Sequence, residues 1–430
     1  MSMYLQTDEQ TIADLRLFPG RDQSGILQIY NETSTHGGEA LMMDMFHHPL
    51  CDPDEITRRS GIIAAFAGMG TRFPFAGAVL DGVEKYLRLG MEDDGSSANP
   101  GEREIASGVA AVITWLQQMR EFVETGDVAG VKGLEQERME LRQLFADPAL
   151  APVFQDVSRQ KLSFAATTAF DVLLRQREKS KILRVLNITY LLDVFIAVAG
   201  VANTRRFIFA KPLPRASGAL RVEGVYHPEL KNAVANDLSL DNSRNIIFLT
   251  GANMAGKSTF LRAFSTAVYI AHMGFPVAAS YMEFPVMDGI FTTINLPDNL
   301  GIGASHFYAE VLRVKKVAAA LHSGKSLFIL FDELFRGTNV KDAHEGTVAV
   351  IQAFAERKDS LFIISSHIVE AGEELSATPG VAFCYLPTRM KGHQPEYTYR
   401  LEQGITDDRH GMIIIRNEGI LDILKNGKKR

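Results

Sequence analysis

The segment GANMAGKS at 251–258 constrains the fold of this chain more than any other part of its 430 residues. It fits the phosphate-binding loop pattern G-x-x-x-x-G-K-[ST], in which glycines let successive backbone N–H groups converge on phosphates. The apolar run IIFLT precedes the loop and a helical stretch beginning near Lys257 follows it, which is the context that the pattern requires and that a chance glycine-rich turn would lack. The sequence therefore predicts an α/β domain that binds nucleotide phosphates at a helix N-terminus, with Lys257 paired to the β- and γ-phosphates.

A second motif, SLFILFDEL at 326–334, is an apolar strand that ends in two carboxylates. By itself this pattern is weak evidence, because an apolar strand is often followed by an acidic turn. Downstream of a phosphate loop, however, the two carboxylates predict a hydrolytic site. We expect Asp332 and Ser258 to hold Mg²⁺, and Glu333 to orient and deprotonate the attacking water. The next apolar strand ends in SSH, where His367 stands in the position of a γ-phosphate sensor rather than of an ordinary surface histidine.

The two halves of the chain differ in their apolar spacing. In the first half, apolar residues recur at steps of three and four, which predicts helices at 104–124, 131–146, 160–179 and 182–199. Gly126 is expected to end the first of these as a left-handed cap. The stretch KPLPRASG at 211–218 indicates a linker, and beyond it short apolar strands at 246–250, 290–294, 327–331 and 361–365 alternate with helices, which is typical of a sheet covered on both faces. We expect an all-α domain at 1–215 and an α/β domain at 216–430.

Composition excludes several classes of protein. The net charge of −6 argues weakly against coating nucleic acid through bulk charge, although it leaves room for a local basic stripe. Cys51 and Cys384 form neither a disulfide framework nor a metal motif, so we expect two reduced thiols. The first residues contain acids and no apolar stretch, so they do not predict a signal peptide. The most apolar run, 190–202, is broken by Asp193 and is too short to span a bilayer. We expect a cytoplasmic protein without a membrane partner.

Four segments (TGANMAGKST, DNLGIGASHFYAE, FDELFRGTN and SSH) resemble, in order and spacing, the ATPase domain of the MutS mismatch-repair proteins. The likeness covers 220–425, including VYHPEL at 225–230 and, at about 404–425, a stretch similar to the family's C-terminal helical dimerisation element. More weakly, 32–59 resembles the opening of the MutS core or lever domain. The resemblance implies a core/lever-like domain followed by an ABC-type P-loop ATPase domain, with ATP and Mg²⁺ as cofactors and composite sites across a homodimer.

The resemblance also implies roles for individual residues. The nucleotide would be bound by Gly251, Ala252, Asn253, Met254, Ala255, Gly256, Lys257, Ser258, Thr259 and His227. Ser305 and His306 would reach the nucleotide held by the partner subunit. Thr338 and Asp342, with less weight on Arg336, would organise the dimer-facing edge of the site.

Three positions depart from the family pattern. Ala255 replaces a glycine of the loop, which costs little unless its backbone needs a positive φ. His306 stands where Thr is usual. The aromatic residue that commonly stacks on adenine is replaced by Ala233, which weakens adenine recognition unless Tyr226 or His227 supplies the missing face.

The resemblance leaves the DNA substrate open. The sequence ahead of residue 10 has no room for a mismatch-recognition or connector domain, and no Phe-x-Glu element is suited to wedging into a mismatched step. The leading hypothesis is a MutS-related, DNA-associated ATPase in mismatch repair or DNA damage recognition, with DNA and other repair proteins as partners. The alternatives are an ATP-gated clamp on branched DNA, and a nucleotide-switched protein-interaction module that binds no DNA. Basic residues between 138 and 184 are interleaved with acids, which fits a solvated helix face as well as a DNA track.

Overall fold

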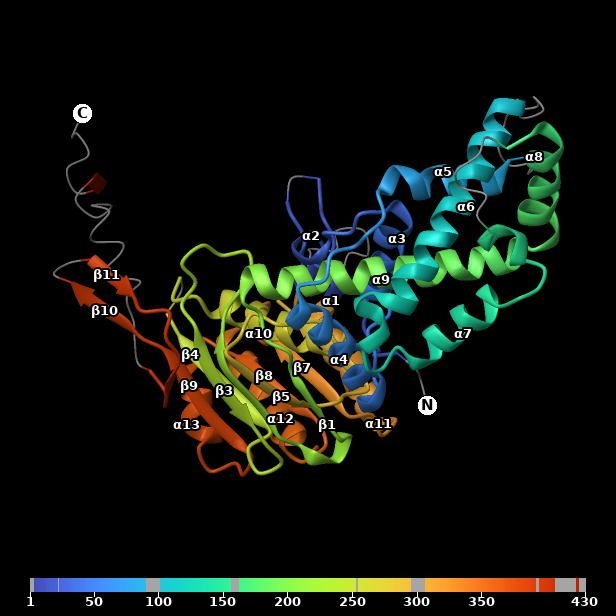
Figure 1. Cartoon of the computed structure of the whole chain (residues 1–430). Coiled ribbons are helices and arrows are strands. Elements are labelled where there is room, and N and C mark those ends of the chain that lie inside the picture. Colours follow the sequence, from blue (N-terminus) through green and yellow to red (C-terminus); the bar gives the residue numbers. More distant parts are fainter. Residues whose placement is uncertain are drawn as a thin grey trace. The chain divides into compact units, whose positions relative to one another are not determined.

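The computed structural model describes residues 4–21, 23–89, 101–155, 162–252, 254–294, 306–391, 394–406 and 423–424. The chain divides into two compact units (Figure 1). The sheet unit comprises Met1–Ile26, His48–Thr57 and Phe207–Arg430, and the helical unit comprises Leu27–His47 and Arg58–Arg206. This division differs from the expected boundary at 215, because two segments of the N-terminal half belong to the sheet unit.

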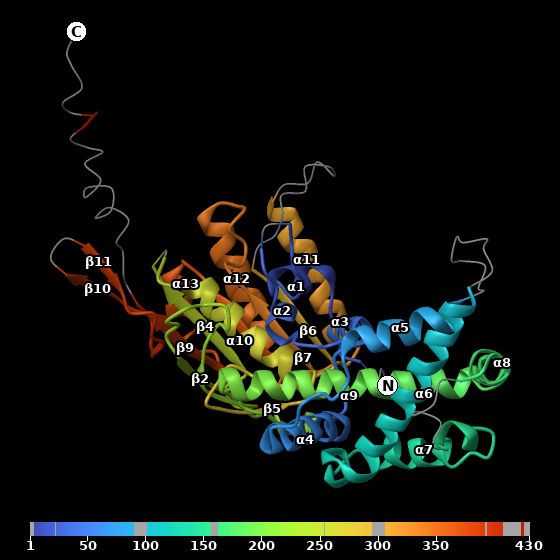
Figure 2. The same ribbon diagram turned by 45° about the horizontal axis from the view of Figure 1, so that its top comes forward.

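The helical unit has helices where the apolar spacing predicted them. The first helices of the chain after residue 25 are α2 (Ile26–Tyr30), α3 (His36–His47), α4 (Pro53–Met69), α5 (Gly77–Arg88), α6 (Glu102–Thr125), α7 (Glu135–Phe145), α8 (Phe164–Asp171), the π-helical segment η4 (Val172–Arg177) and α9 (Lys179–Arg205). Helix α9, green in Figure 2, packs against α3 and α7, while α5 packs against α6. The left-handed cap expected at Gly126 is wrong, because this residue is extended, with φ −88° and ψ −171°.

Asp193 explains how α9 holds the beginning of α3. Its side chain is buried, and its carboxylate accepts hydrogen bonds from the backbone N–H groups of Ser34 and Thr35 and, at 2.7 Å, from Thr35 Oγ1. Burial raises the pKa of Asp193, and these hydrogen bonds oppose that rise. Thr35 Oγ1 in turn accepts the N–H of Gly38 in the first turn of α3, so the acid that interrupts the apolar run of α9 holds the capping residue of another helix in place.

Among the described helices, α9 is long and apolar enough to cross a membrane by length and composition alone. It is 27 residues long, because the helix continues on both sides of the apolar run at 190–202, which alone is too short to span a bilayer. However, 83% of its most apolar window is buried inside the fold. Its apolar surface is thus already used in packing, as in a core helix.

The sheet unit centres on a six-stranded sheet with the order β12-β9-β4-β8-β7-β6. Its strands are β4 (Ile246–Gly251), β6 (Gly289–Thr293), β7 (Leu327–Phe331), β8 (Leu361–Ser365), β9 (Val381–Leu386) and β12 (Glu402–Gln403). All neighbours are parallel except β12, which is antiparallel to β9. Continuous apolar runs form the central strands because helices cover both faces.

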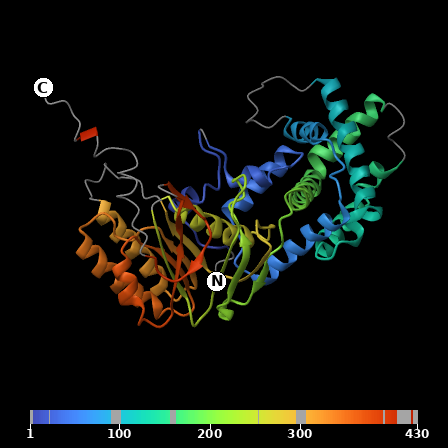
Figure 3. The same cartoon turned by 90° about the vertical axis from the view of Figure 1, so that its left-hand side faces the viewer.

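Different helices cover the two faces of this sheet (Figure 3). On one face, α11 (His306–His322), α12 (Val340–Ala355) and α13 (Val369–Leu375) share a buried cluster with Phe248, Ile329 and Phe362. On the other face, α10 (Lys257–His272) brings Phe264 within 5.7 Å of the Phe328 ring. Alternate residues of each strand therefore enter separate cores, and the carboxyl ends of β4, β7 and β8 meet at one edge.

The segment at 211–218, expected to be a linker, is part of the fold. Its first residues form β1 (Lys211–Leu213), which pairs in parallel with β5 (Tyr281–Pro285). This second sheet has the order β1-β5-β2-β3, where β2 is Leu220–Val225 and β3 is Asn236–Leu240. Pro212 is tolerated because β1 is an edge strand. A separate hairpin joins β10 (Thr388–Lys391) to β11 (Gln394–Tyr397).

The N-terminal residues 4–21 belong to the sheet unit because they bond to its β6 edge. Gln6 donates its N–H to Asp288 O and accepts from Ile290 N–H, at 2.8 and 2.9 Å. Helix α1 (Glu9–Asp14) follows, and the Asp14 carboxylate accepts hydrogen bonds from Thr292 Oγ1 and Ile294 N–H. These polar contacts reach across more than 270 residues, so helical spacing in the sequence gives no sign of them.

Candidate functional site

The phosphate loop joins β4 to α10, as the motif predicted. Left-handed φ values occur at Met254 (70°) and Gly256 (98°) and not at Ala255. The backbone at Ala255 therefore does not require glycine, so the departure at this position is compatible with the loop. Within the loop, the Met254 side chain is 74% exposed, whereas the Ala255 side chain is buried. Asn253 lies outside the described residues.

Lys257 reaches back over the loop that it follows. Its Nζ donates hydrogen bonds to the carbonyls of Gly251 and Ala252 at 2.7 and 3.2 Å, and only 5% of the residue is exposed. Burial lowers the pKa of Lys257, while Glu333 and Asp332 oppose this effect. The ammonium group thus lies between the loop and the two carboxylates, where a nucleotide phosphate would find a fixed positive charge.

Ser258 and Asp332 come together at the first turn of α10. Ser258 Oγ donates a hydrogen bond to Asp332 Oδ2, although 74 residues separate them. A hydroxyl and a carboxylate are the two protein ligands that suit Mg²⁺ with phosphates and water. Among the described residues, no group of three or more His, Cys, Asp and Glu side chains could hold a metal alone. The donor set therefore fits Mg²⁺ held jointly with a nucleotide.

Glu333 and His367 form an adjacent pair. His367 Nε2 lies 2.6 Å from Glu333 Oε1, and Arg336 Nη1 lies 4.0 Å from Oε2 of the same carboxylate. The hydrogen bond from His367 lowers the pKa of Glu333, more than burial raises it. Glu333 therefore carries a negative charge at neutral pH, and its backbone has a left-handed φ of 61°. The structure thus brings the Glu–His pair, Lys257, Ser258 and Asp332 to one edge of the sheet.

A cavity of about 320 Å³ lies beside the loop. It is lined by the predicted residues His227 and Thr259, by Tyr226 and Ala233, and by Tyr399, which the sequence did not single out. Tyr399 lies so close to the loop that a Cβ on Gly256 would approach its ring to 2.9 Å. An aromatic face is therefore present despite Ala233, but it comes from a segment more than 160 residues downstream.

His227 and Asn236 shape this cavity. His227 is 6% exposed, its Nε2 has no hydrogen-bond partner, and burial lowers its pKa to about 4. Asn236 donates its side-chain N–H to Tyr399 O at 3.0 Å and accepts from Leu401 N–H at 2.7 Å. Asn236 thus fixes the Tyr399 backbone, and the neutral His227 has one buried ring nitrogen without a hydrogen-bond partner beside the cavity.

Comparison with known proteins identifies the family of this chain. The family model for MutS domain V matches residues 247–429, which contain the loop and both carboxylates. The DNA mismatch repair protein MutS of Listeria welshimeri is 28% identical over 256 residues, covering 56% of this chain and 29% of the relative. MutS of Carboxydothermus hydrogenoformans is 30% identical over 255 residues (58% and 30%), and MutS of an Exiguobacterium species is 25% identical over 349 residues (77% and 41%).

This chain belongs to the MutS family. It spans less than half the length of these MutS relatives.

The residues predicted to reach the partner's nucleotide (Ser305 and His306) and to organise the dimer-facing edge (Thr338 and Asp342) are placed unevenly. His306 begins α11, lines a small pocket with Asp332 and Glu333, and has its Nε2 3.4 Å from Arg336 Nη2. Asp342 instead lies in the first turn of α12 and pairs with the N-cap residue Asn339. Its backbone N–H donates to Asn339 Oδ1, and its carboxylate accepts from Asn339 Nδ2 at 2.6 Å. Thr338 is half-buried just before α12. Ser305 and most of the predicted dimerisation element at 404–425 lie outside the described residues.

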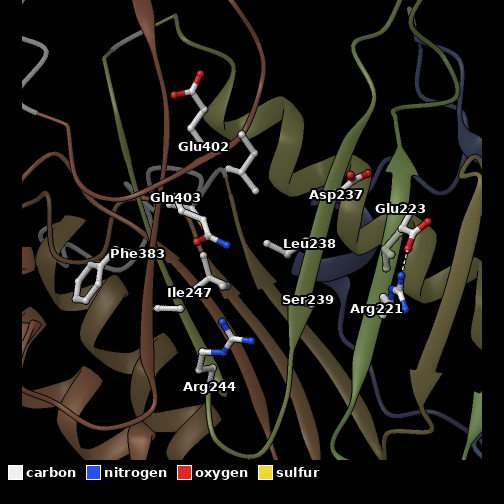
Figure 4. A pocket seen from close by; sticks show the side chains of 14 residues that line it. Arg221, Glu223, Asp237, Leu238, Ser239, Arg244, Ile247, Phe383, Glu402 and Gln403 are labelled. Carbon is white, nitrogen blue, oxygen red and sulfur yellow. Dashed lines mark hydrogen bonds and ion pairs between the residues drawn. The ribbon is translucent and has the colours of Figure 1, made fainter.

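A larger groove of about 420 Å³ lies between β3 and the strands β4, β9 and β12 (Figure 4). Several of its charged side chains already have partners within the fold. Arg221 pairs with Glu223, the Asp237 carboxylate accepts from Gly224 N–H at 2.7 Å, and Glu402 accepts from Tyr385 at 2.9 Å. Arg244, the other cation that lines the groove, lies 3.7 Å from the Asp241 carboxylate. The described lining thus pairs both of its arginines with acids and does not include the phosphate loop of this MutS chain.

Proposed function

We propose that this chain binds ATP with Mg²⁺ at 251–258 and hydrolyses it with Glu333 as the group that activates water. The convergence of one cation, one hydroxyl and two carboxylates at the phosphate loop carries this proposal. Lys257 would bind the β- and γ-phosphates in place of its present carbonyl acceptors. Asp332 and Ser258 would hold Mg²⁺, which supplies neutralisation of phosphate charge when bound.

Glu333 and His367 would have separate roles in the hydrolysis step. The ionised Glu333 carboxylate can accept the proton of a water and orient it in line with the γ-phosphate. His367, hydrogen-bonded to that carboxylate, would contact the γ-phosphate and keep Glu333 in place. His306 and Arg336 line the adjoining pocket. We propose that a homodimer brings this edge to the nucleotide of the partner subunit and so completes two composite sites.

The cavity lined by Tyr399 and His227 is proposed to take the adenine ring. Its size suits a base, and the Tyr399 ring lies directly over Gly256 of the loop. An aromatic face and an orphaned nitrogen are the two features that a flat, hydrogen-bonding base requires. Both are provided although Ala233 occupies the position where the family carries its usual aromatic residue.

We further propose that the ATPase acts on DNA through shape and backbone charge rather than by wedging into a mismatch. Three Phe-x-Glu sequences occur in the chain, at 122–124, 331–333 and 354–356. Phe331 and Phe354 are buried, and the Phe122 ring meets the Phe75 ring edge-on at 6.0 Å. Because two of these rings are buried and the half-buried Phe122 ring is engaged with Phe75, we propose that none of the three is presented to a base step.

A second candidate function, a nucleotide-switched module that binds a protein, is favoured by the charges of the helical unit. Many of its cations are paired with acids, in the ion pairs Arg58–Glu137, Arg175–Asp171, Lys181–Asp147 and Arg184–Glu140. Paired cations attract DNA phosphates less than free ones do.

Mg²⁺-dependent ATP hydrolysis by the purified chain, measured with and without duplex and four-way-junction DNA, tests both proposals. Hydrolysis stimulated by DNA supports the first. A hydrolysis rate that DNA does not change, together with no DNA binding, supports the second.

A further inference from the structure

The hydroxyl of Ser365 joins the two carboxylate residues of the site. Ser365 ends β8, is fully buried, and donates a hydrogen bond from Oγ to Asp332 Oδ1 at 2.5 Å. The same oxygen accepts a hydrogen bond from Glu333 N–H at 3.0 Å. Ser365 and Asp332 come next after the paired residues Phe331 and Ile364, so the register of β7 and β8 sets them side by side.

These two hydrogen bonds give the hydroxyl a fixed direction. A serine hydroxyl has one proton to donate and lone pairs to accept, and here the proton goes to Asp332 while a lone pair takes the Glu333 N–H. With Oδ1 of Asp332 held by Ser365, Oδ2 is the oxygen that faces Ser258 of the phosphate loop. Orientation of the Mg²⁺-holding carboxylate therefore depends on Ser365.

The bond to Glu333 acts on the backbone. Glu333 has a φ of 61°, a left-handed conformation that non-glycine residues adopt only when their surroundings hold them there. The Ser365 hydroxyl receives the N–H of this residue, and His367 holds the other end of it through the carboxylate. Residues 365 and 367 thus hold Glu333 from both sides.

We propose that Ser365 is a positioning residue for ATP hydrolysis, which sets the Mg²⁺-holding Asp332 and the water-activating Glu333 relative to each other. This inference rests on the proposed ATPase function. Ser365 itself touches neither nucleotide nor metal. Its loss should therefore lower kcat and raise the Mg²⁺ concentration needed for half-maximal activity, while ATP binding through Lys257 and the loop amides is kept.

Ser366 provides a matched control, because it is the adjacent serine and is equally buried. Its Oγ accepts a hydrogen bond from Ile368 N–H at 3.0 Å, in the turn that follows β8. The Ser366 hydroxyl takes no part in the contacts of Asp332 and Glu333 described above. A Ser366→Ala variant removes a buried hydroxyl without removing a contact to Asp332 or Glu333. Any cost that is merely structural should appear in both alanine variants.

The experiment compares the wild-type chain with Ser365→Ala, Ser365→Cys, Ser365→Thr and Ser366→Ala. For each protein, steady-state hydrolysis is measured against ATP and against Mg²⁺, and thermal unfolding is followed in parallel. The cysteine variant keeps the branching of serine with a somewhat larger atom and only a weak S–H donor, so it leaves no cavity and remains informative if the alanine variant fails to fold. The threonine variant keeps the hydroxyl.

We expect Ser365→Ala and Ser365→Cys to lose about tenfold in kcat and to need about threefold more Mg²⁺, with KM for ATP changed less than about twofold. Ser365→Thr should recover most of the activity, and Ser366→Ala should resemble wild type. Equal kcat and Mg²⁺ dependence in Ser365→Cys and Ser366→Ala would overturn the inference while leaving the ATPase proposal intact. A wild-type chain that hydrolyses no ATP would instead overturn the proposed function and this inference with it.

Discussion

His367 Nε2 lies 2.6 Å from Glu333 Oε1, and this hydrogen bond is the largest influence that lowers the pKa of the Glu333 carboxyl. A His367→Ala variant removes it, while burial, which raises the pKa, remains. The pKa of Glu333 should then rise. Because the ionised carboxylate is the form that accepts the proton of water, hydrolysis falls as pH drops through this pKa. The acidic limb of the kcat–pH profile should therefore move to higher pH in the variant.

The pH profile of Mg²⁺-dependent hydrolysis, taken from about pH 5 to pH 9, checks this shift. His344→Ala is a suitable control, since His344 pairs with Glu374 on the neighbouring helix at 3.5 Å. We expect the control to keep the wild-type profile. An acidic limb that stays in place in His367→Ala, with normal folding, would contradict the role given to this pair.

Lys257→Ala should abolish ATP binding at ordinary concentrations. The loop amides would keep part of the phosphate contact, but the buried ammonium group would be lost. Charge-assisted hydrogen bonds of this kind contribute roughly 1.5–3 kcal/mol each, so affinity should fall at least about tenfold. Titration with a fluorescent ATP analogue measures the change. Wild-type affinity in the variant would mean that 251–258 does not hold the phosphates.

Asp8 ties the N-terminal residues to α11. Burial alone would raise its pKa, but hydrogen bonds from Arg313 and Lys316 hold the pKa of this carboxyl far below its ordinary value. A lowered folded-state pKa stabilises the protein above the ordinary carboxyl pKa, and this stability is lost as pH falls through the lowered value. Asp8→Asn should therefore lower the free energy of unfolding by about 2 kcal/mol at neutral pH and by less in acid.

Denaturant unfolding at pH 7 and at a pH well below 3.8, the ordinary pKa of this carboxyl, tests the Asp8 prediction. Glu9→Gln is the matched control, because it removes the same charge from the adjacent, exposed residue. The control should unfold like wild type at both pH values. If Asp8→Asn did the same, the N-terminal residues would not be held by this ion pair.

DNA binding by this chain should be nearly equal for matched and mismatched duplexes and should weaken steeply with salt. In the three Phe-x-Glu sequences, Phe331 and Phe354 are buried and the half-buried Phe122 ring packs edge-on against Phe75, so none of these rings is placed to exploit the easier unstacking of a mispaired step. Competition of a homoduplex against a single G·T mismatch at moderate salt tests this. A mismatch preference of about tenfold, which is about 1.4 kcal/mol, would contradict it. Absence of binding to either duplex and to a four-way junction would favour the protein-interaction function.

Much of the fold could be predicted from local sequence. The strands at 327–331 and 361–365 lie where their unbroken apolar runs placed them, since a strand buried on both faces leaves no other pattern. The loop at 251–258 could be predicted equally well, because its glycines and lysine all lie within one short segment. The linker predicted at 211–218 is wrong, because proline also occurs in edge strands, as Pro212 does in β1.

What local sequence missed depends on contacts between distant segments. Ser365 becomes significant only once β7 and β8 are neighbours in a fixed register. Tyr399 reaches the phosphate loop through a backbone held by Asn236, 163 residues away in sequence. Residues 4–21 join the sheet unit through single polar contacts such as Asp14 with Thr292. None of these relationships leaves a periodic or motif signal.

Glu333→Gln tests the central claim most directly, because it keeps the shape of the side chain and removes its capacity to accept a proton. The measurement is ATP–Mg²⁺ affinity, single-turnover hydrolysis and sedimentation of the same protein with saturating ATP. The account predicts wild-type affinity, hydrolysis slowed by at least about a hundredfold, and a more dimeric protein in the trapped ATP state. Hydrolysis at the wild-type rate would contradict the assignment of Glu333, and a monomer with bound ATP would contradict the composite site.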